Sequence, residues 1–182
     1  MKRPGGPGRS EEFERFYAAR YPEITGYVQR RVTRTDVDDI VAQVFLVAWR
    51  RFHEIPDPPA DRLWLFVVAR NVLADHARSR RRQDRLEFRL EAEAATTRVS
   101  HDGDPMPDSV WAALSALRPQ DREALQLVLW DDLSHADAAA VAGCSANAFE
   151  IRYRRARTAV RDALATGGPS SVSPIPVREN AR

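Results

Sequence analysis

Apolar residues recur three or four positions apart along most of the chain. Val37, Ile40, Val41 and Val44 show this spacing, which places one apolar stripe on the surface of a helix. No segment alternates apolar and polar residues between turn signals, as a half-buried strand does. The pattern therefore predicts an all-α protein.

The first half of the chain is predicted to form a series of amphipathic helices. One begins near Ser10, and Pro22 is expected to end it and to open the next, because proline lacks the backbone N–H that a helix interior uses. A further helix is expected from about Thr35 to Phe52, followed by a loop over residues 53–60 that contains three prolines. The last helix of this half begins near Asp61.

The helical periodicity disappears between about residues 94 and 108, where Thr, Ser, Asp, Gly and Pro gather. This composition predicts a flexible linker between two small helical domains, residues 10–93 and 109–165. Residues 1–9 and 166–182 are rich in Gly, Pro, Ser and charged residues, and we expect them to be disordered tails.

The second domain is predicted to begin with a short helix from about Val110 to Leu117. Pro119 then opens another helix, since proline suits the first helical turn. In that helix Leu125, Val128 and Leu129 are expected to face inward.

Residues 134–164 carry the pattern of a helix-turn-helix. Ser134 is a good N-cap, Gly143 can take the left-handed conformation of a tight turn, and Ser145 can cap the next helix. That second helix has an apolar stripe formed by Phe149, Tyr153, Ala156, Val160 and Leu164. The stripe leaves facing outward the residues Asn147, Glu150, Ile151, Arg154 and Arg155. They lie on the turns where a recognition helix meets DNA bases, although a charged helical hairpin is the structural alternative.

The formal net charge of +2 is modest, but the positive residues are nearly all arginine and are unevenly distributed. One block consists of Arg78, Arg80, Arg81, Arg82, Arg85 and Arg89, and a second of Arg152, Arg154, Arg155, Arg157 and Arg161. Such blocks bind the phosphates of nucleic acids, although either block alone could be a solvated helix face. Together they favour nucleic-acid binding.

Composition argues against several other classes of protein. No apolar run is long enough to span a membrane and no signal-peptide pattern opens the chain, so we expect a cytoplasmic protein. Cys144 is the only cysteine, which excludes an intramolecular disulfide and a multi-thiolate metal site. The histidines are scattered, and we find neither a nucleophile–base pair nor a Gly-rich phosphate loop. We therefore expect no enzymatic activity, cofactor or metal.

Three stretches of the chain carry a family resemblance. They run from Asp38 to Trp49 (DDIVAQVFLVAW), from Trp64 to Asn71 (WLFVVARN) and from Leu117 to Arg157. In their order and spacing they resemble the extracytoplasmic-function (ECF) class of bacterial sigma factors, the smallest members of the sigma-70 family. The likeness covers most of residues 13–164.

The resemblance implies a specificity subunit that binds core RNA polymerase through the clamp helices of its largest subunit and through its flap. The residues that match the clamp-binding surface are Asp38, Asp39, Gln43 and Trp49. Alternatively, the aspartates only support a helix N-terminus and the tryptophan only packs. Family members usually carry Gln and then an acidic residue where this chain has Ala42 and Gln43, so the contact is expected to differ in detail.

By the same resemblance, the N-terminal domain recognises and melts the minus-ten promoter element. The residues that match or adjoin its DNA-contacting surface are His53, Arg62, Asn71, Asp75, Arg78 and Arg81. The arginines are expected to hold phosphates and the displaced strand. Trp64 is a candidate for stacking on an unpaired base, but its apolar neighbours favour a position in the core.

The C-terminal domain is expected to read the minus-thirty-five element. The residues assigned to this contact are Asn147, Glu150, Ile151, Arg154, Arg155 and Arg157. Arg154 and Arg155 are the expected base readers, since arginine in the major groove prefers guanine, and the other arginines are expected to hold phosphates. Glu150 departs from the basic residue common at its position, since a carboxylate repels phosphate but accepts a hydrogen bond from the cytosine amino group.

Two other classes of protein stay open from the sequence. A free-standing regulator would bind duplex operators as a dimer through the helix-turn-helix, but it would not need the stretch from Asp38 to Trp49. A sigma-like decoy would bind polymerase or an inhibitor without starting transcription. ECF sigma factors are often held by an anti-sigma factor, so such a partner is a further expectation of the resemblance, although no residue identifies it.

Overall fold

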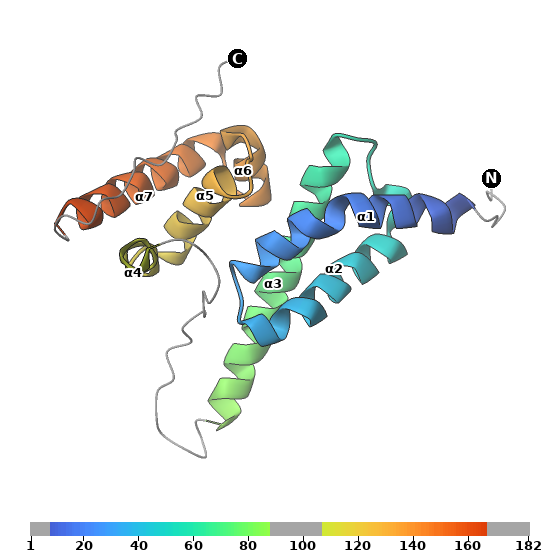
Figure 1. The fold of residues 1–182 in the computed structure, drawn as a ribbon, viewed down its shortest axis with the longest axis horizontal. Helices are drawn as coiled ribbons and strands as arrows, with labels where there is room; N and C mark the ends of the chain where they lie inside the picture. The colour runs from blue at the N-terminus through green and yellow to red at the C-terminus, as the bar shows by residue number, and fades with distance from the viewer. Residues whose placement is uncertain (1–7, 88–106, 167–182) are drawn as a thin grey trace.

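The computed structural model describes residues 8–87 and 107–166, with the side chains of residues 83–87 left aside. Within these ranges the chain is helical and contains no strand, which confirms the predicted all-α class. The N-terminal module consists of α1 (Gly8–Gln29), α2 (Val37–Arg50) and α3 (Ala60–Glu87) (Figure 1). The C-terminal module consists of α4 (Asp108–Ser115), α5 (Pro119–Leu129), α6 (His135–Val141) and α7 (Ala146–Thr166). Short 3-10 turns, Arg34–Asp36 and Phe52–Glu54, precede and follow α2.

The predicted linker and the two predicted tails lie almost wholly outside the described residues. Apart from Pro107, their described residues belong to helices, because α1 begins at Gly8, α4 begins at Asp108 and α7 ends at Thr166. The flexibility expected of these three segments stays a prediction.

α1 is a single helix that continues through Pro22, so the prediction that this proline separates two helices was wrong. Proline removes only its own N–H donor, and both halves of α1 pack on the rest of the module. Phe13 and Phe16 contact aromatic rings of α2 and of the turn after it, at centroid distances of 4.9 to 6.5 Å. In the second half, Tyr27 and Val28 are completely buried. Tertiary packing therefore outweighs the local helix-breaking effect.

The C-terminal module is built around α7, which α4, α5 and α6 all contact. Its inner cluster of buried apolar residues consists of Val110, Leu114, Leu125 and Ala156. Trp111 and Trp130 pack against this cluster, with their ring centroids 5.6 Å apart. This packing keeps one face of α7 inside the module.

The two modules pack against each other and share one apolar core. α6 of the C-terminal module contacts α3 of the N-terminal module (Figure 1). The buried residues that the C-terminal module adds to the shared core are Ala124, Leu127, Leu133, Ala138, Ala139, Val141, Ala142 and Phe149. The helix-turn-helix is therefore held against the N-terminal module, and is not an independent appendage of the fold.

α5 is buried on two sides as a result. Leu125 packs inside the C-terminal module, whereas Ala124 and Leu127 belong to the core shared with the N-terminal module. The prediction that Leu129 faces inward was wrong, because this residue is 48% exposed. The apolar spacing of α5 could not show which of its leucines the other module covers.

Candidate nucleic-acid interface

α6 and α7 form the predicted helix-turn-helix, and its capping residues occupy their expected positions. Ser134 Oγ accepts a hydrogen bond from the backbone N–H of Asp137 at 3.1 Å, at the start of α6. Gly143 has a φ of 63°, the left-handed conformation that this tight turn requires. Ser145 Oγ accepts from the backbone N–H of Ala148 at 3.2 Å and caps α7. These contacts confirm the predicted turn.

α7 buries one face and exposes the opposite one. On the inner face Phe149 and Ala156 are completely buried, and the stripe is extended by the half-buried residues Tyr153, Val160 and Leu164. The exposed residues include Asn147, Ile151, Arg154, Arg155 and Arg157. Glu150 lies among them and is half-buried. The structure therefore brings together on one face the residues assigned to the minus-thirty-five element.

Glu150 is held by two neighbours. Its Oε2 lies 2.8 Å from Nδ1 of His135 at the start of α6, and its Oε1 accepts a hydrogen bond from Nη2 of Arg154 at 3.2 Å. The hydrogen bonds from Arg154 and then from His135 hold the pKa of Glu150 below its ordinary value. Glu150 thus connects Arg154 to the first helix of the helix-turn-helix, a link that the sequence did not predict.

A different acidic residue holds Arg155. The Nε and Nη2 atoms of Arg155 donate hydrogen bonds to the two carboxylate oxygens of Asp121 in α5, at 2.8 and 2.5 Å. Asp121 is buried. The hydrogen bond to Asp121 raises the pKa of Arg155 above its ordinary value. Sequence reasoning missed Asp121, because an acidic residue is common in the first turn of any helix. Arg155 is therefore fixed to the scaffold, whereas Arg154 is paired with Glu150 on the same helix.

α3 carries most of the residues assigned to the minus-ten element. Asn71 and Asp75 are exposed one turn apart, and Arg78, a further turn along, forms an ion pair with Asp75. Arg81 follows on the same helix and is also exposed. These side chains make one exposed strip along α3, which we call the α3 strip.

Two other residues assigned to the minus-ten element lie apart from the α3 strip. His53 is exposed in the short turn after α2. Arg62 is half-buried near the start of α3; it donates to Glu23 of α1 and, at 2.7 Å, to the backbone carbonyl of Asp131 in the C-terminal module. Trp64 packs partly buried against the shared core, as its apolar neighbours predicted.

The residues assigned to polymerase binding are all exposed on α2, namely Asp38, Asp39, Gln43 and Trp49. Trp49 packs against its neighbours but remains accessible. Its ring centroid lies 4.9 Å from that of Phe13, and the guanidinium carbon of Arg9 lies 4.9 Å from the same ring centroid. Trp49 is nevertheless 37% exposed. Leu46, three residues from both Gln43 and Trp49, is 45% exposed and was missed. An apolar residue on the α2 surface was the signal that could have identified it.

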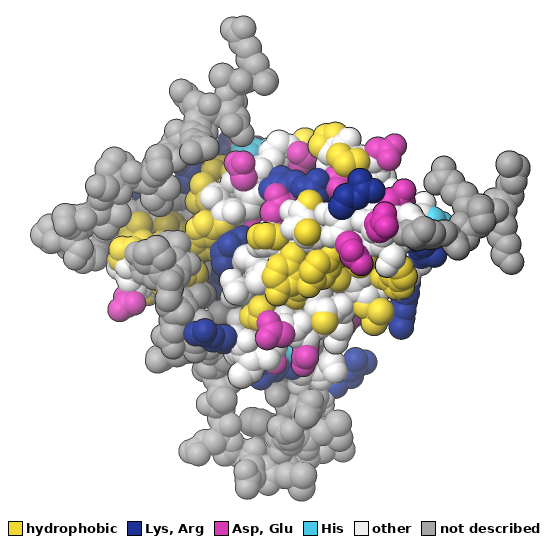
Figure 2. All heavy atoms as spheres, turned by 45° about the vertical axis from the view of Figure 1, so that its right-hand side comes forward, with side chains coloured by type: hydrophobic (Ala, Val, Ile, Leu, Met, Phe, Trp, Pro, Cys, Tyr) yellow, Lys and Arg dark blue, Asp and Glu magenta, His cyan; other side chains and the backbone are white. Residues whose placement is uncertain are grey.

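An apolar patch extends from α2 onto α1. Its exposed large hydrophobic residues are Tyr17, Tyr21, Leu46 and Trp49. The rings of Tyr17 and Tyr21 are 5.1 Å apart. Figure 2 shows apolar side chains gathered on the N-terminal module, with acidic and basic side chains around them. A patch with such a polar rim is typical of a surface that binds another protein.

Other kinds of site have little support in the described part of the chain. No group of three or more His, Cys, Asp or Glu is placed there to hold a metal ion. Cys144 is half-buried in the turn between α6 and α7 and packs against the shared core. None of the described helices has both the length and the apolar character needed to cross a membrane.

The capped helix-turn-helix, with arginines on its exposed face, defines a helical DNA-binding protein. Each of the two modules matches a known sequence family. Residues 16–83 match the family described as Sigma-70 region 2, and residues 108–160 match the one described as Sigma-70, region 4. Together the two matches cover most of the N-terminal module and most of the C-terminal module.

Known relatives extend the match. The ECF RNA polymerase sigma factor SigC of Mycobacterium tuberculosis is 30% identical over 154 residues, which cover 84% of this chain and 83% of SigC. The ECF RNA polymerase sigma factor BldN of Streptomyces coelicolor is 30% identical over 167 residues, 85% of this chain but 61% of BldN. The chain belongs to the ECF class of the sigma-70 family, the sigma factors that direct RNA polymerase to promoters.

Solved structures share the fold. One is the sigma factor RpoE in complex with the anti-sigma factor NepR from Bartonella quintana, with a TM-score of 0.69, 22% identity, and coverage of 87% of this chain and 99% of that chain. Another is CnrH in complex with the cytosolic domain of CnrY, with a TM-score of 0.62, 27% identity, and coverage of 87% and 91%. The likeness therefore spans both modules.

Proposed function

We propose that the two modules divide promoter recognition between them. α7 reads the minus-thirty-five element from the major groove, and the α3 strip with the turn before α3 contacts the minus-ten element. The exposed side of α2 binds the clamp helices of the largest polymerase subunit, and the C-terminal module binds the flap. The observation that carries the proposal is the capped helix-turn-helix whose assigned DNA-contacting residues share one exposed face.

Within α7, we assign base reading to Arg154 and a positioning role to Glu150. The carboxylate of Glu150 lies 3.2 Å from the Arg154 guanidinium and fixes the direction in which its remaining N–H groups point. A guanidinium held in this way can donate to O6 and N7 of guanine. Arg155, fixed to Asp121, and the exposed Arg157 hold backbone phosphates.

In the N-terminal module, Asn71 and Asp75 present polar groups that can read the edges of unpaired bases, as their exposure on α3 allows. Arg78 and Arg81 continue the strip and supply positive charge for the phosphates of the same strand. His53 lies ahead of α3 in an exposed turn, where it can contact a base beside this strip.

On α2, we add Leu46 to the polymerase-binding residues. It lies between Gln43 and Trp49 on the exposed side of the helix and is part of the apolar patch. Acidic residues at the start of α2 supply charge for specificity, and the apolar patch supplies buried area for affinity.

The protein acts through binding energy and not through catalysis, in the cytoplasm where polymerase and promoter DNA meet. An anti-sigma factor is included as a further partner. The support for it is the likeness of the fold to RpoE and CnrH, whose structures contain the proteins NepR and CnrY.

In vitro transcription with purified core polymerase and a promoter library tests this proposal. We expect transcripts from a subset of promoters that share two sequence elements. Arg154→Ala should weaken transcription from this subset and relax the preference at one base position of the upstream element, whereas Arg161→Ala, an exposed arginine near the end of the same helix, should keep the wild-type preference. Absence of any initiated transcript with folded protein would falsify the proposal.

A further inference from the structure

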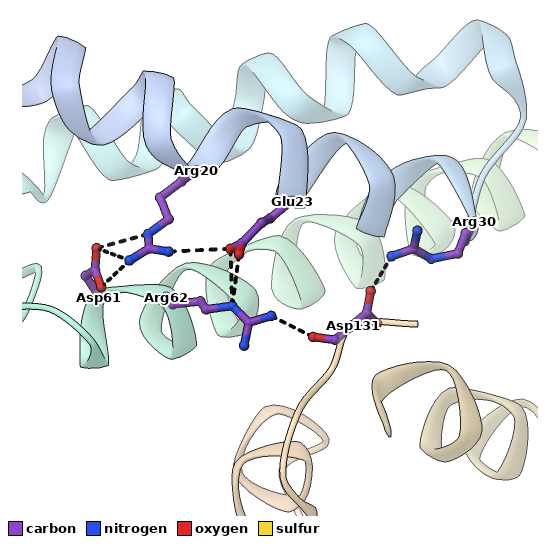
Figure 3. Close-up of polar contacts among 6 residues, drawn as sticks. All are labelled: Arg20, Glu23, Arg30, Asp61, Arg62 and Asp131. Atoms are coloured by element: carbon purple, nitrogen blue, oxygen red, sulfur yellow. Dashed lines mark hydrogen bonds and ion pairs between the residues drawn. The ribbon is translucent and has the colours of Figure 1, made fainter. Parts of the chain in front are cut away.

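Three arginines of the N-terminal module converge on one residue of the C-terminal module. Arg30 and Arg31, directly after α1, contact the two carboxylate oxygens of Asp131 at 2.5 and 2.7 Å. Arg62 donates to the backbone carbonyl of Asp131 at 2.7 Å (Figure 3). The Asp131 side chain is 0% exposed. We call Arg30, Arg31 and Arg62 the arginine cluster.

Two members of the arginine cluster, Arg31 and Arg62, are held in place by their own module. Arg31 Nη1 donates to the carbonyl of Tyr27 at 2.8 Å, and its guanidinium lies 3.6 Å from the centre of the Tyr27 ring. Arg62 Nε lies 3.2 Å from both oxygens of Glu23, and its guanidinium lies 5.2 Å from the ring centre of Phe66. None of these contacts involves Asp131, so they preorganise Arg31 and Arg62 without it.

A second layer of ion pairs supports this arrangement. Arg20 lies between Asp61, at 2.9 Å, and Glu23, at 3.6 Å (Figure 3). Since Arg20 neutralises Asp61, the cluster retains a positive charge in excess over Glu23 and Asp131. Arg30 Nε is buried without a hydrogen-bond partner among the described residues. The cluster therefore has both charge and a donor left for a larger anion.

The packed modules hold their two DNA-contacting faces close together. Arg70 pairs with Glu123 of α5 at 2.6 Å, and a Cβ built on Gly143 would lie 3.7 Å from the Arg70 Nη1 atom. Asn71 is the next residue after Arg70, and Arg154 lies about two turns into α7, which begins just after Gly143. Chain geometry therefore keeps Asn71 and Arg154 within about 40 Å of each other.

Two promoter elements centred at minus ten and minus thirty-five are separated by about 25 base pairs, or about 85 Å of straight duplex. Packed modules cannot contact both. The modules therefore part on a promoter, and the segment between them allows it, since residues 88–106 can reach about 65 Å when extended. Parting withdraws Asp131 from the arginine cluster.

We propose that the arginine cluster is a binding site for a backbone phosphate of DNA, and that Asp131 fills this site while the modules are packed. A carboxylate presents two anionic oxygens to two guanidinium groups, as a phosphate does. When the modules part, a phosphate of the promoter replaces Asp131. The inference rests on the proposed function, because it requires both modules to bind one promoter.

The exchange is energetically feasible because it replaces one anion by another. When the modules part, Asp131 and the arginines become hydrated, and the arginine cluster then binds the phosphate. No buried charge is therefore left without a partner, either in the packed modules or in the DNA complex. Asp131 thereby couples the packing of the modules to DNA binding. Its removal should favour the DNA-bound state.

The test compares Asp131→Asn with Asp132→Asn in the full chain. Both variants lose one negative charge, but Asp132 is exposed. Binding to a promoter duplex is measured by fluorescence anisotropy over a range of salt concentrations. Asp131→Asn should bind about 5- to 10-fold more tightly and gain about one unit in salt slope, while Asp132→Asn should change binding less than about twofold.

A second variant tests whether the arginines cause the gain. Adding Arg31→Gln to Asp131→Asn should abolish it, whereas adding Arg50→Gln, at the exposed end of α2, should not. Glu123→Gln removes the ion pair with Arg70 and so weakens the packing of the modules without altering the cluster. This variant should therefore also bind DNA more tightly. It replaces Asp131→Asn in the test if Asp131→Asn fails to fold.

An equal gain in Asp131→Asn and Asp132→Asn, or a gain that survives Arg31→Gln, overturns the phosphate site. Neither result affects transcription by the wild-type chain with core polymerase. Failure of that transcription overturns the proposed function instead, so the two ideas can be separated.

Discussion

Arg155 and Asp121 form a two-point ion pair, with nitrogen–oxygen distances of 2.8 and 2.5 Å, between residues 34 positions apart. The aspartate is buried in α5, and the arginine projects from the exposed face of α7. The adjacent Arg154 instead pairs with Glu150 on the surface of the same helix. Two neighbouring arginines that look equivalent in the sequence therefore have different surroundings.

We expect Arg154→Ala and Arg155→Ala to affect DNA binding differently. Arg154→Ala should relax the preference chiefly at one base position, at a cost of about 1–3 kcal/mol for the preferred base. Arg155→Ala should weaken binding to all sequences alike and lower the melting temperature, because it leaves the buried Asp121 carboxylate without its cation. Binding to a randomised promoter library and thermal unfolding measure the two effects.

Arg81→Ala is the control for loss of a phosphate contact, since Arg81 is exposed on α3. It should weaken binding without changing base preference or melting temperature. If Arg154→Ala and Arg81→Ala relaxed the preference equally, the assignment of Arg154 as a base reader would be wrong.

Leu127 and Leu129 provide a matched pair for the contact between the modules. Leu127 is completely buried in the shared core, whereas Leu129 is 48% exposed. Leu127→Ala should lower the free energy of unfolding by about 2–5 kcal/mol, because it removes buried apolar atoms and leaves a cavity. Leu129→Ala should change it by less than about 0.5 kcal/mol. Urea denaturation checks both values, and similar losses would contradict the packing of α5.

Pro22 lies inside α1 and is exposed, so its side chain contributes little packing. A proline in a helix interior costs about 3 kcal/mol, since it removes one backbone hydrogen bond and crowds the preceding turn. Pro22→Ala should therefore raise the free energy of unfolding by about 1–3 kcal/mol. Urea denaturation measures this gain, and a less stable variant would show that the proline is needed to shape α1.

Tyr27 predicts a stability difference at alkaline pH. Burial raises its pKa to about 12, and its hydroxyl has no hydrogen-bond partner among the described residues. An unfolded tyrosine has a pKa of about 10, so the folded state favours the neutral form. This contribution to stability is complete below about pH 10 and is lost as the pH rises through about 12.

Tyr27→Phe removes this ionisation. At pH 7 the variant should be as stable as the wild type or more stable by up to about 1 kcal/mol, because no unpaired hydroxyl is buried. Between pH 10 and 12 its advantage should grow by about 2–3 kcal/mol. Unfolding measured over this range checks the trend, and a constant difference would mean that Tyr27 does not titrate as its burial implies.

The helix-turn-helix could be predicted because its signals are local. Ser134 and Ser145 cap helices that begin within a few residues of them, and Gly143 alone provides the conformation of the turn. The exposed face of α7 follows in the same way from the spacing of Phe149 and Ala156. The residues assigned to DNA therefore share a face that the periodicity had already indicated.

Other features depended on contacts between residues far apart in the chain. The sequence by itself did not reveal that Asp121 holds Arg155, that Asp131 fills the arginine cluster or that Leu127 is covered and Leu129 is not. Local periodicity determines which face of a helix is apolar. Only the tertiary structure decides which surface covers that face and which charges meet there, because both depend on how distant elements pack.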